Sequence, residues 1–71
     1  MKYTEFHRLI VRNGWKFDCA EGSHYFYTKV VVDENGVEKV LRSTPVPFHG
    51  SKEIGEGLRN KIKKQMDLKQ V

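Results

Sequence analysis

Apolar residues near the start of the chain follow the spacing of a helix. Phe6, Leu9 and Ile10 lie at i, i+3 and i+4, so they share one helix face. Thr4 is a residue type that caps helix starts, and Asn13-Gly14 suits the left-handed conformation that commonly ends helices. The pattern predicts a helix from about residue 4 to residue 13.

The period then changes from that of a helix to that of a strand. Trp15, Phe17 and Cys19 alternate with polar or small residues, which is typical of a half-buried strand, and Glu21-Gly22 turns the chain afterwards. A lone cysteine cannot form an internal disulfide, so we interpret Cys19 as a small buried apolar side chain. We expect the first strand over residues 15–20.

Two further runs rich in aromatic and β-branched residues predict a hairpin. They span residues 23–32 and 37–46 and flank Asn35-Gly36, which is the strongest short signal for a hairpin turn. With these two residues at the centre of the turn, counting outward brings His24 opposite Pro47, unless a bulge shifts the register. Prolines cannot donate ladder hydrogen bonds, so we expect this end of the third strand to lie at an edge.

A second helix is predicted at the end of the chain. Its apolar residues recur every four positions, and basic residues cover much of the remaining surface. The apolar positions are Ile54, Leu58, Ile62 and Met66. We expect this helix to begin near Glu56, because Gly55 and Gly57 disfavour an earlier helix interior.

The order helix, three antiparallel strands, helix predicts a single α+β domain over residues 1–71, with two helices on one face of a three-stranded sheet. Double-stranded-RNA-binding domains have this order, although other small α+β folds share it. Charged residues interrupt every apolar run in the first ten positions, so we expect no signal peptide, no membrane span and a cytoplasmic location.

Charge narrows the class of partner. The chain has 13 Lys and Arg against 9 Asp and Glu, a formal net charge of +4, which favours polyanionic partners without identifying one. The sequence has no glycine-rich phosphate loop, no carboxylate pair with a shared site, and no Cys/His cluster at metal-ligand spacing. We therefore expect no metal and no other cofactor.

His24 is the candidate for chemistry, because a histidine titrates near neutral pH and can take the proton of an RNA 2′-OH. A surface histidine without a function is the alternative interpretation. His49 lies two residues past Pro47, so the register places it diagonally from His24, with Cα atoms about 7 to 8 Å apart, unless it already begins a loop. We expect His7 to be solvated on the polar side of the first helix.

Several basic residues are candidates for binding phosphate or for stabilising a developing charge, and a solvated surface explains them nearly as well. They are Lys29, Arg42, Lys52, Arg59, Lys61, Lys63 and Lys64. The aromatic residues of the strands can stack on bases or fill the core, and their parity does not decide between the two.

Four segments together resemble the HicA family of toxin ribonucleases. Asn13-Gly14-Trp15 closes the first helix, Gly22-Ser23-His24 opens the second strand, and Val46-Pro47-Phe48-His49 closes the third. The basic terminal helix from Leu58 to Leu68 completes the resemblance, which covers nearly the whole chain.

The resemblance implies a double-stranded-RNA-binding-like fold and a type II toxin that cleaves mRNA without the ribosome. It also implies neutralisation by a HicB-type antitoxin, with DNA contacted only through that antitoxin. His24 takes the position of the catalytic residue, Gly22 and Ser23 form the turn that presents it, and His49 is a second candidate site residue. The alternative function is a non-catalytic module that binds double-stranded RNA.

The chain departs from the family pattern at two points. Tyr25 stands where many relatives have a second histidine, which leaves the general acid open. The hairpin between His24 and Pro47 is also several residues longer than usual, a difference that bears on the antitoxin contact or on RNA preference.

Overall fold

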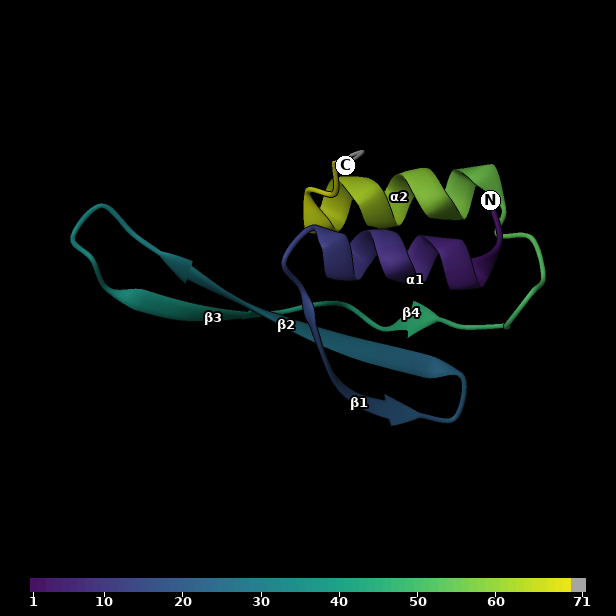
Figure 1. The fold of residues 1–71 in the computed structure, drawn as a ribbon, viewed down its shortest axis with the longest axis horizontal. Helices are drawn as coiled ribbons and strands as arrows, with labels where there is room; N and C mark the ends of the chain where they lie inside the picture. Colours follow the sequence, from purple (N-terminus) through teal and green to yellow (C-terminus); the bar gives the residue numbers. More distant parts are fainter. Residues whose placement is uncertain (70–71) are drawn as a thin grey trace.

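The computed structural model describes residues 1–69 and shows two helices packed on an antiparallel sheet (Figure 1). The elements in chain order are α1 (Tyr3–Arg12), β1 (Lys16–Glu21), β2 (His24–Val32), β3 (Glu38–Arg42), β4 (Val46–Pro47) and α2 (Glu56–Met66). The predicted α+β fold is confirmed, and α2 begins at the predicted residue. The predicted third strand is divided into β3 and β4, because the chain between them leaves the ladder.

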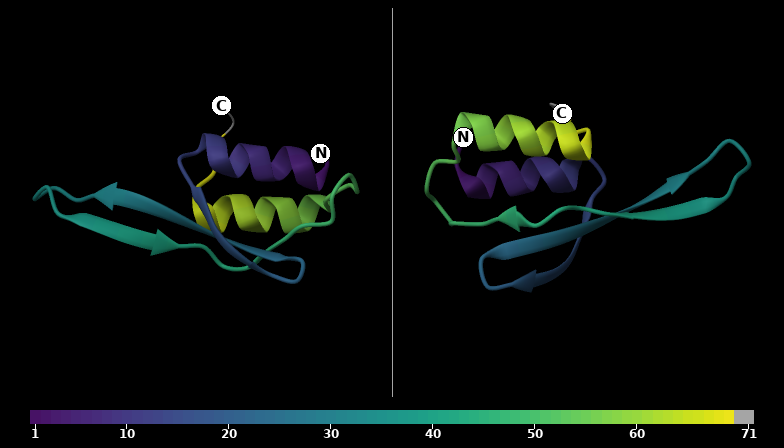
Figure 2. Two further views of the ribbon diagram at one scale, coloured as in Figure 1. Left: turned by 60° about the horizontal axis from the view of Figure 1, so that its bottom comes forward. Right: turned by 180° about the vertical axis from the view of Figure 1, so that it is seen from behind.

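The two helices lie side by side over one face of the sheet, as Figures 1 and 2 show. β2 is central: β1 pairs with one of its edges, and β3 and β4 share the other. The side chains of Phe6, Ile10 and Val46 are fully buried between the layers. Beyond the helices, β2 and β3 continue as a two-stranded ribbon that protrudes from the body (Figures 1 and 2).

The start of α1 is capped by the loop that precedes α2. The backbone N–H of Tyr3 donates to the carbonyl of Lys52 at 3.0 Å, and that of Thr4 donates to the carbonyl of Gly50 at 3.2 Å. These carbonyls satisfy two of the four N–H groups that a helix start leaves unpaired. The predicted Thr4 cap was therefore wrong, since Thr4 is already inside the helix.

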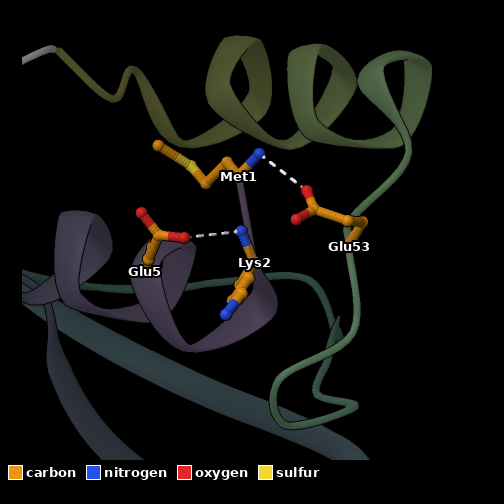
Figure 3. A network of polar contacts seen from close by, with 4 residues as sticks. All are labelled: Met1, Lys2, Glu5 and Glu53. Atoms are coloured by element: carbon orange, nitrogen blue, oxygen red, sulfur yellow. Dashed lines mark hydrogen bonds and ion pairs between the residues drawn. The ribbon is translucent and has the colours of Figure 1, made fainter.

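Charged groups reinforce this junction (Figure 3). The amino group of Met1 donates to the Glu53 carboxylate at 2.9 Å, and the Lys2 N–H donates to the Glu5 carboxylate at 3.1 Å. The N-terminal ammonium of Met1, which donates this hydrogen bond to Glu53, lowers the pKa of the Glu53 carboxyl. Because Glu53 directly precedes the buried Ile54, these contacts hold the approach to α2 against the start of α1.

A bulge in β1 overturns the predicted alternation of buried residues. Phe17 pairs with Tyr27 and Cys19 pairs with Phe26, so Asp18 is an extra residue in the strand. The bulge puts Phe17 and Cys19 on opposite faces of the sheet, since one inserted residue reverses the parity of the side chains. Phe17 remains 49% exposed, and Cys19 is only partly buried.

The tip of the β2–β3 hairpin has a three-residue loop instead of the predicted two. Asp33 donates its N–H to the carbonyl of Val37 at 3.0 Å, which leaves residues 34–36 as the loop, with Gly36 in the left-handed region at φ 77°. The Asp33 carboxylate also accepts the N–H groups of Asn35 and Val37, each at 2.9 Å. The register beside the loop is therefore one residue away from the predicted count.

A second irregularity restores that count. Thr28 pairs with Arg42, and Tyr25 pairs with Val46. Between these two pairs β2 has two residues, 26 and 27, whereas the opposite segment has three, residues 43–45. His24 consequently pairs with Pro47, as predicted. The prediction is confirmed because two deviations of one residue cancel.

Candidate active site

His24 is the first residue of β2 and follows a two-residue turn. Glu21 pairs with His24, so Gly22 and Ser23 form the loop between β1 and β2. Gly22 has φ 57°, whereas Ser23 is not among the residues with positive φ, which is the pattern of a type II′ hairpin turn. Phe48 donates its N–H to the Ser23 carbonyl at 2.7 Å and ties the turn to the segment after β4. This tight turn leaves His24 exposed at the end of the sheet.

His24 lines a hollow between the β4 edge and α2. The hollow has a volume of about 350 Å³. It is lined by His24, Thr44, Pro45, Pro47, Leu58, Lys61, Ile62 and Gln65. β4, which pairs with the start of β2, is an edge strand of only two residues, so the sheet ends beside His24.

His24 and Lys61 are the two ionisable residues that line the hollow, and no carboxylate of the described residues joins them. Thr44 donates its hydroxyl hydrogen to Gln65 Oε1 at 3.2 Å across the hollow, which links the loop before β4 to α2. An imidazole that can accept a proton and an ammonium that can stabilise negative charge suit an anionic ligand.

His49 lies outside this lining. Its ring stands edge-on against Tyr3 of α1, with ring centroids 5.0 Å apart, and its carbonyl accepts the N–H of Lys52 at 3.3 Å. The Phe48–Ser23 hydrogen bond shows that the backbone ladder continues to the residue before His49. The ring of His49 nevertheless packs against Tyr3 of α1, whereas His24 lines the hollow to which α2 contributes.

The remaining basic candidates are spread over the surface. Lys29 places its Nζ 5.8 Å from the Trp15 ring centroid, and Arg42 places its guanidinium carbon 4.8 Å from the centroid of Phe26. Arg42 also reaches the Cys19 sulfur at 3.8 Å. Neither Lys29 nor Arg42 lines the hollow, and the same is true of Lys52, Arg59, Lys63 and Lys64.

His7 is buried, so the prediction that it is solvated was wrong. Its side chain is 7% exposed, its Nε2 lies 2.9 Å from the Pro47 carbonyl oxygen, and its Nδ1 lies 2.6 Å from the Tyr27 hydroxyl. A carbonyl only accepts, so Nε2 carries the hydrogen, and in the neutral ring Nδ1 accepts the hydrogen of Tyr27. Burial lowers the pKa of His7, although the Pro47 hydrogen bond opposes this, and burial raises the pKa of Tyr27 to about 12.

The sequence does contain a signal for the burial of His7. Tyr3, Phe6, His7 and Ile10 lie at i, i+3, i+4 and i+7, the full stripe of a core-facing helix. Reading the histidine as polar hid that stripe. The His7 ring contacts the rings of Tyr25 and Phe48 edge-on, with centroids 5.2 and 4.9 Å from its own.

A second hollow, of about 470 Å³, opens beside His7. It is lined by Thr4, His7, Arg8, Val11, Arg12, Tyr27 and Phe48. The two ring nitrogens of His7 are already engaged with Tyr27 and Pro47, so this hollow offers no free imidazole. Chemistry that needs a histidine is therefore restricted to the hollow beside His24 or to the exposed His49.

Residues 1–69 contain no group of three or more His, Cys, Asp or Glu side chains arranged to hold a metal ion. Over the same residues, no helix combines the length and the apolar character that crossing a membrane requires.

The fold and the hollow describe a small α+β protein in which His24 and Lys61 line one hollow, and comparison with known proteins gives its family. The model of the family described as HicA toxin of bacterial toxin-antitoxin matches residues 3–68. A protein of Pseudomonas fluorescens (strain Pf0-1), named probable mRNA interferase HicA, is 45% identical over 69 residues, which are 97% of this chain and 98% of the relative. The chain belongs to the HicA toxin family, as the resemblance indicated. No solved structure matches it.

Proposed function

We propose that this protein is the toxin of a toxin–antitoxin pair and that it cleaves mRNA with His24 as the catalytic base. The observation that carries the proposal is the hollow that exposed His24 and Lys61 both line, on a chain whose 45% identical relative is named a probable mRNA interferase. A tight turn presents the imidazole, and an edge strand of two residues leaves room for a nucleic-acid strand beside it.

In the proposed reaction, His24 takes the proton of a ribose 2′-OH, and the 2′-oxygen attacks the adjacent phosphorus. The bond from phosphorus to the 5′-oxygen breaks, the 5′-oxygen takes up a proton, and a cyclic phosphate remains. Lys61 stabilises the negative charge that develops on the phosphoryl oxygens, because it lines the same hollow. No step requires a metal ion.

The other basic residues act on binding more than on chemistry. Arg59, Lys63 and Lys64 share α2 with Lys61, and Lys52 precedes that helix, so they can contact phosphates on either side of the reacting one. Arg42 lies over the Phe26 ring and Lys29 lies near the Trp15 ring, and neither lines the hollow. We therefore assign the charge stabilisation to Lys61 and not to these two residues.

A HicB-type antitoxin would inhibit by covering the His24 hollow. A standard interface buries about 800 Å² on each partner, and this toxin exposes only 5025 Å² in total over its described residues. An interface of that size centred on α2 and β4 leaves little of the hollow accessible. The net charge of +4 favours an acidic partner surface.

The test is the substitution His24→Gln, measured by decay of a defined mRNA with the purified toxin, in EDTA and in magnesium. We expect cleavage to fall at least about 100-fold and the melting temperature to stay unchanged, because a general base contributes 10²- to 10⁴-fold and His24 is exposed. Wild-type cleavage should be equal in EDTA and in magnesium.

His49→Gln is the matched variant, because His49 is also exposed and carries the same titratable group. We expect the smaller loss from His49→Gln, since its ring packs on Tyr3 and not in the hollow. Equal decay by folded His24→Gln and wild type would refute the assignment. Tight binding of double-stranded RNA without any cleavage by the wild type would favour the non-catalytic alternative.

A further inference from the structure

The ribbon formed by β2 and β3 beyond the helices exposes an unusual amount of apolar surface (Figures 1 and 2). Its exposed apolar side chains are Val30 at 58%, Val32 at 63%, Val37 at 54%, Val40 at 69% and Leu41 at 43%. Val30 pairs with Val40, and Val32 lies two residues from Val30, so these three side chains share one face of the ribbon. An isolated two-stranded hairpin is at best marginally stable in water, and exposed apolar side chains gathered on one face mark an interaction site. The ribbon therefore calls for a partner.

Hydrogen bonding within the ribbon shows which backbone groups are free for that partner. Asp33 and Val37 form a bonded pair at the tip, and Ser43 donates its N–H to the Tyr27 carbonyl at the base. Bonded pairs alternate in an antiparallel ladder, so Lys39 and Leu41 bond inward to β2. The N–H and C=O groups of residues 38, 40 and 42 consequently point to the outer edge of β3, which is the last strand of the sheet.

We propose that β3 pairs antiparallel with β3 of a second copy of this chain, centred on Val40. In this register Val40 lies opposite Val40 of the other copy, and Glu38 lies opposite Arg42 twice. All three outward residues of each strand find bonding partners, so the pairing closes six backbone hydrogen bonds. Opposite charges at facing positions stabilise antiparallel strands. Glu38 and Arg42 form both charged pairs, because they lie at equal distances on either side of Val40 in the strand.

Other ways of pairing two copies lose this complementarity. A shift of the register by two residues puts Glu38 opposite Val40 and leaves one outward residue of each strand beyond the partner strand. Pairing through the free outer edge of β2 brings Val30 and Val32 to the bonded positions, and neither side chain carries a charge. The β3 edge centred on Val40 is the self-complementary one, as a two-fold interface requires.

The overall shape allows the pairing. The body lies at the Arg42 end of β3, and antiparallel pairing sends the body of the second copy to the opposite end, so the helices do not collide (Figure 1). The two-fold axis crosses the sheet, which keeps the same face of both copies on one side. His24 and Val30 lie six residues apart on β2, so they share a face, and Val30 pairs with Val40. Both His24 side chains therefore face the same side of the dimer.

Sedimentation velocity of the full chain over a range of concentrations tests the pairing. A single pair of short strands buries less than a standard interface, so we expect reversible dimers with a Kd on the order of 100 µM. Val40→Pro removes an outward N–H and should leave only monomer. Val32→Pro is the control, because Val32 pairs with Glu38 and its N–H points to the opposite edge of the ribbon; dimerisation should be unchanged.

Charge reversal tests the register. Glu38→Arg and Arg42→Glu should each weaken dimerisation about tenfold, since each places like charges opposite one another twice, and the double variant should restore it to within about twofold. Melting temperatures check that each variant is folded, because Arg42 also packs on Phe26.

Three outcomes would overturn the proposal. They are a wild-type chain that stays monomeric up to millimolar concentration, equal effects of Val40→Pro and Val32→Pro, and a double charge reversal that fails to restore the dimer. A monomeric wild type whose antitoxin binding is weakened by Val40→Pro would assign the β3 edge to the antitoxin instead of a second copy.

Discussion

Two histidines lie on either side of the same proline, and their surroundings give them opposite roles. His7 donates to the Pro47 carbonyl and accepts from Tyr27, so its ring has no free nitrogen. His24 pairs with Pro47 along the ladder but remains exposed at the strand end. The difference shows that residue type alone does not make a site. A histidine that acts as a base needs an accessible ring nitrogen, whereas a buried histidine with both ring nitrogens hydrogen-bonded acts as a core residue.

The hollows beside the two histidines differ in the same sense. The larger, of about 470 Å³, adjoins His7 and the rings of Tyr27 and Phe48, whereas the smaller, of about 350 Å³, joins His24 to Lys61. By volume alone, the hollow beside His7 would be chosen as the reaction site, whereas the residues that line each hollow favour the one beside His24. We assign the reaction to the smaller hollow, because it alone combines a free imidazole with an ammonium.

The largest expected effect on stability comes from His7→Ala. The change opens a cavity and leaves the Tyr27 hydroxyl and the Pro47 carbonyl without their partner, so we expect a loss of about 2 to 4 kcal/mol in the free energy of unfolding. In a domain of this size that lowers the melting temperature by at least about 10 °C. Urea unfolding and thermal scans measure both quantities.

His24→Ala is the matched change at the exposed histidine, and it should alter the free energy of unfolding by no more than about 0.5 kcal/mol. If the two alanine variants lose equal stability, or if His24→Ala loses more, the contrast between a core and a site histidine does not hold.

The sequence predicted the elements better than it predicted their environment. Helix α2, the antiparallel hairpin and the α+β order follow from the spacing of apolar residues and from turn residues, which are visible in short stretches of sequence. The Thr4 cap failed because carbonyls of residues 50 and 52, far along the chain, reach the start of α1 first. The parity of Phe17 and Cys19 failed because a single bulge at Asp18 reverses it, and no local pattern marks that bulge.

Prediction of the site was uneven for the same physical reason. The turn at Gly22 is local and was found, whereas the pairing of His24 with Pro47 was found because two deviations of one residue cancel along the hairpin. Lys61 was one of seven basic candidates, because only the packing of α2 against the β4 edge singles it out. His7 was missed because its role depends on Tyr27, twenty residues away in the chain.

Within the smaller hollow, Lys61→Met should lower cleavage by about 10- to 100-fold, since it removes the charge that stabilises the transition state but keeps a similar apolar stem. Lys64→Met is the control, because Lys64 lies exposed on the same helix and does not line the hollow. Both variants lose one positive charge, so general attraction to RNA falls equally. Equal cleavage rates for the two variants would remove Lys61 from the mechanism.

The smallest expected effect is a dependence of stability on pH that belongs to His7. Burial holds the folded-state pKa of His7 below the usual 6.5, so the unfolded chain binds the proton first as pH falls. Stability is therefore fully present above about pH 6.5, falls as the pH drops below that value, and stops falling on this account below the folded-state pKa. One proton limits the slope to about 1.4 kcal/mol per pH unit. Glu53, whose pKa is lowered from 4.5, acts in a separate, more acidic window.

Urea unfolding of the wild type and of His7→Gln between pH 5 and pH 8 isolates this contribution, because the two proteins differ only at residue 7. We expect the difference in unfolding free energy between wild type and variant to shrink as the pH falls below about 6.5, since only the wild type then takes up the extra proton on unfolding. A difference that stays constant over this range would mean that His7 titrates alike in the folded and unfolded chain. The contrast with His24 would then rest on hydrogen bonding alone.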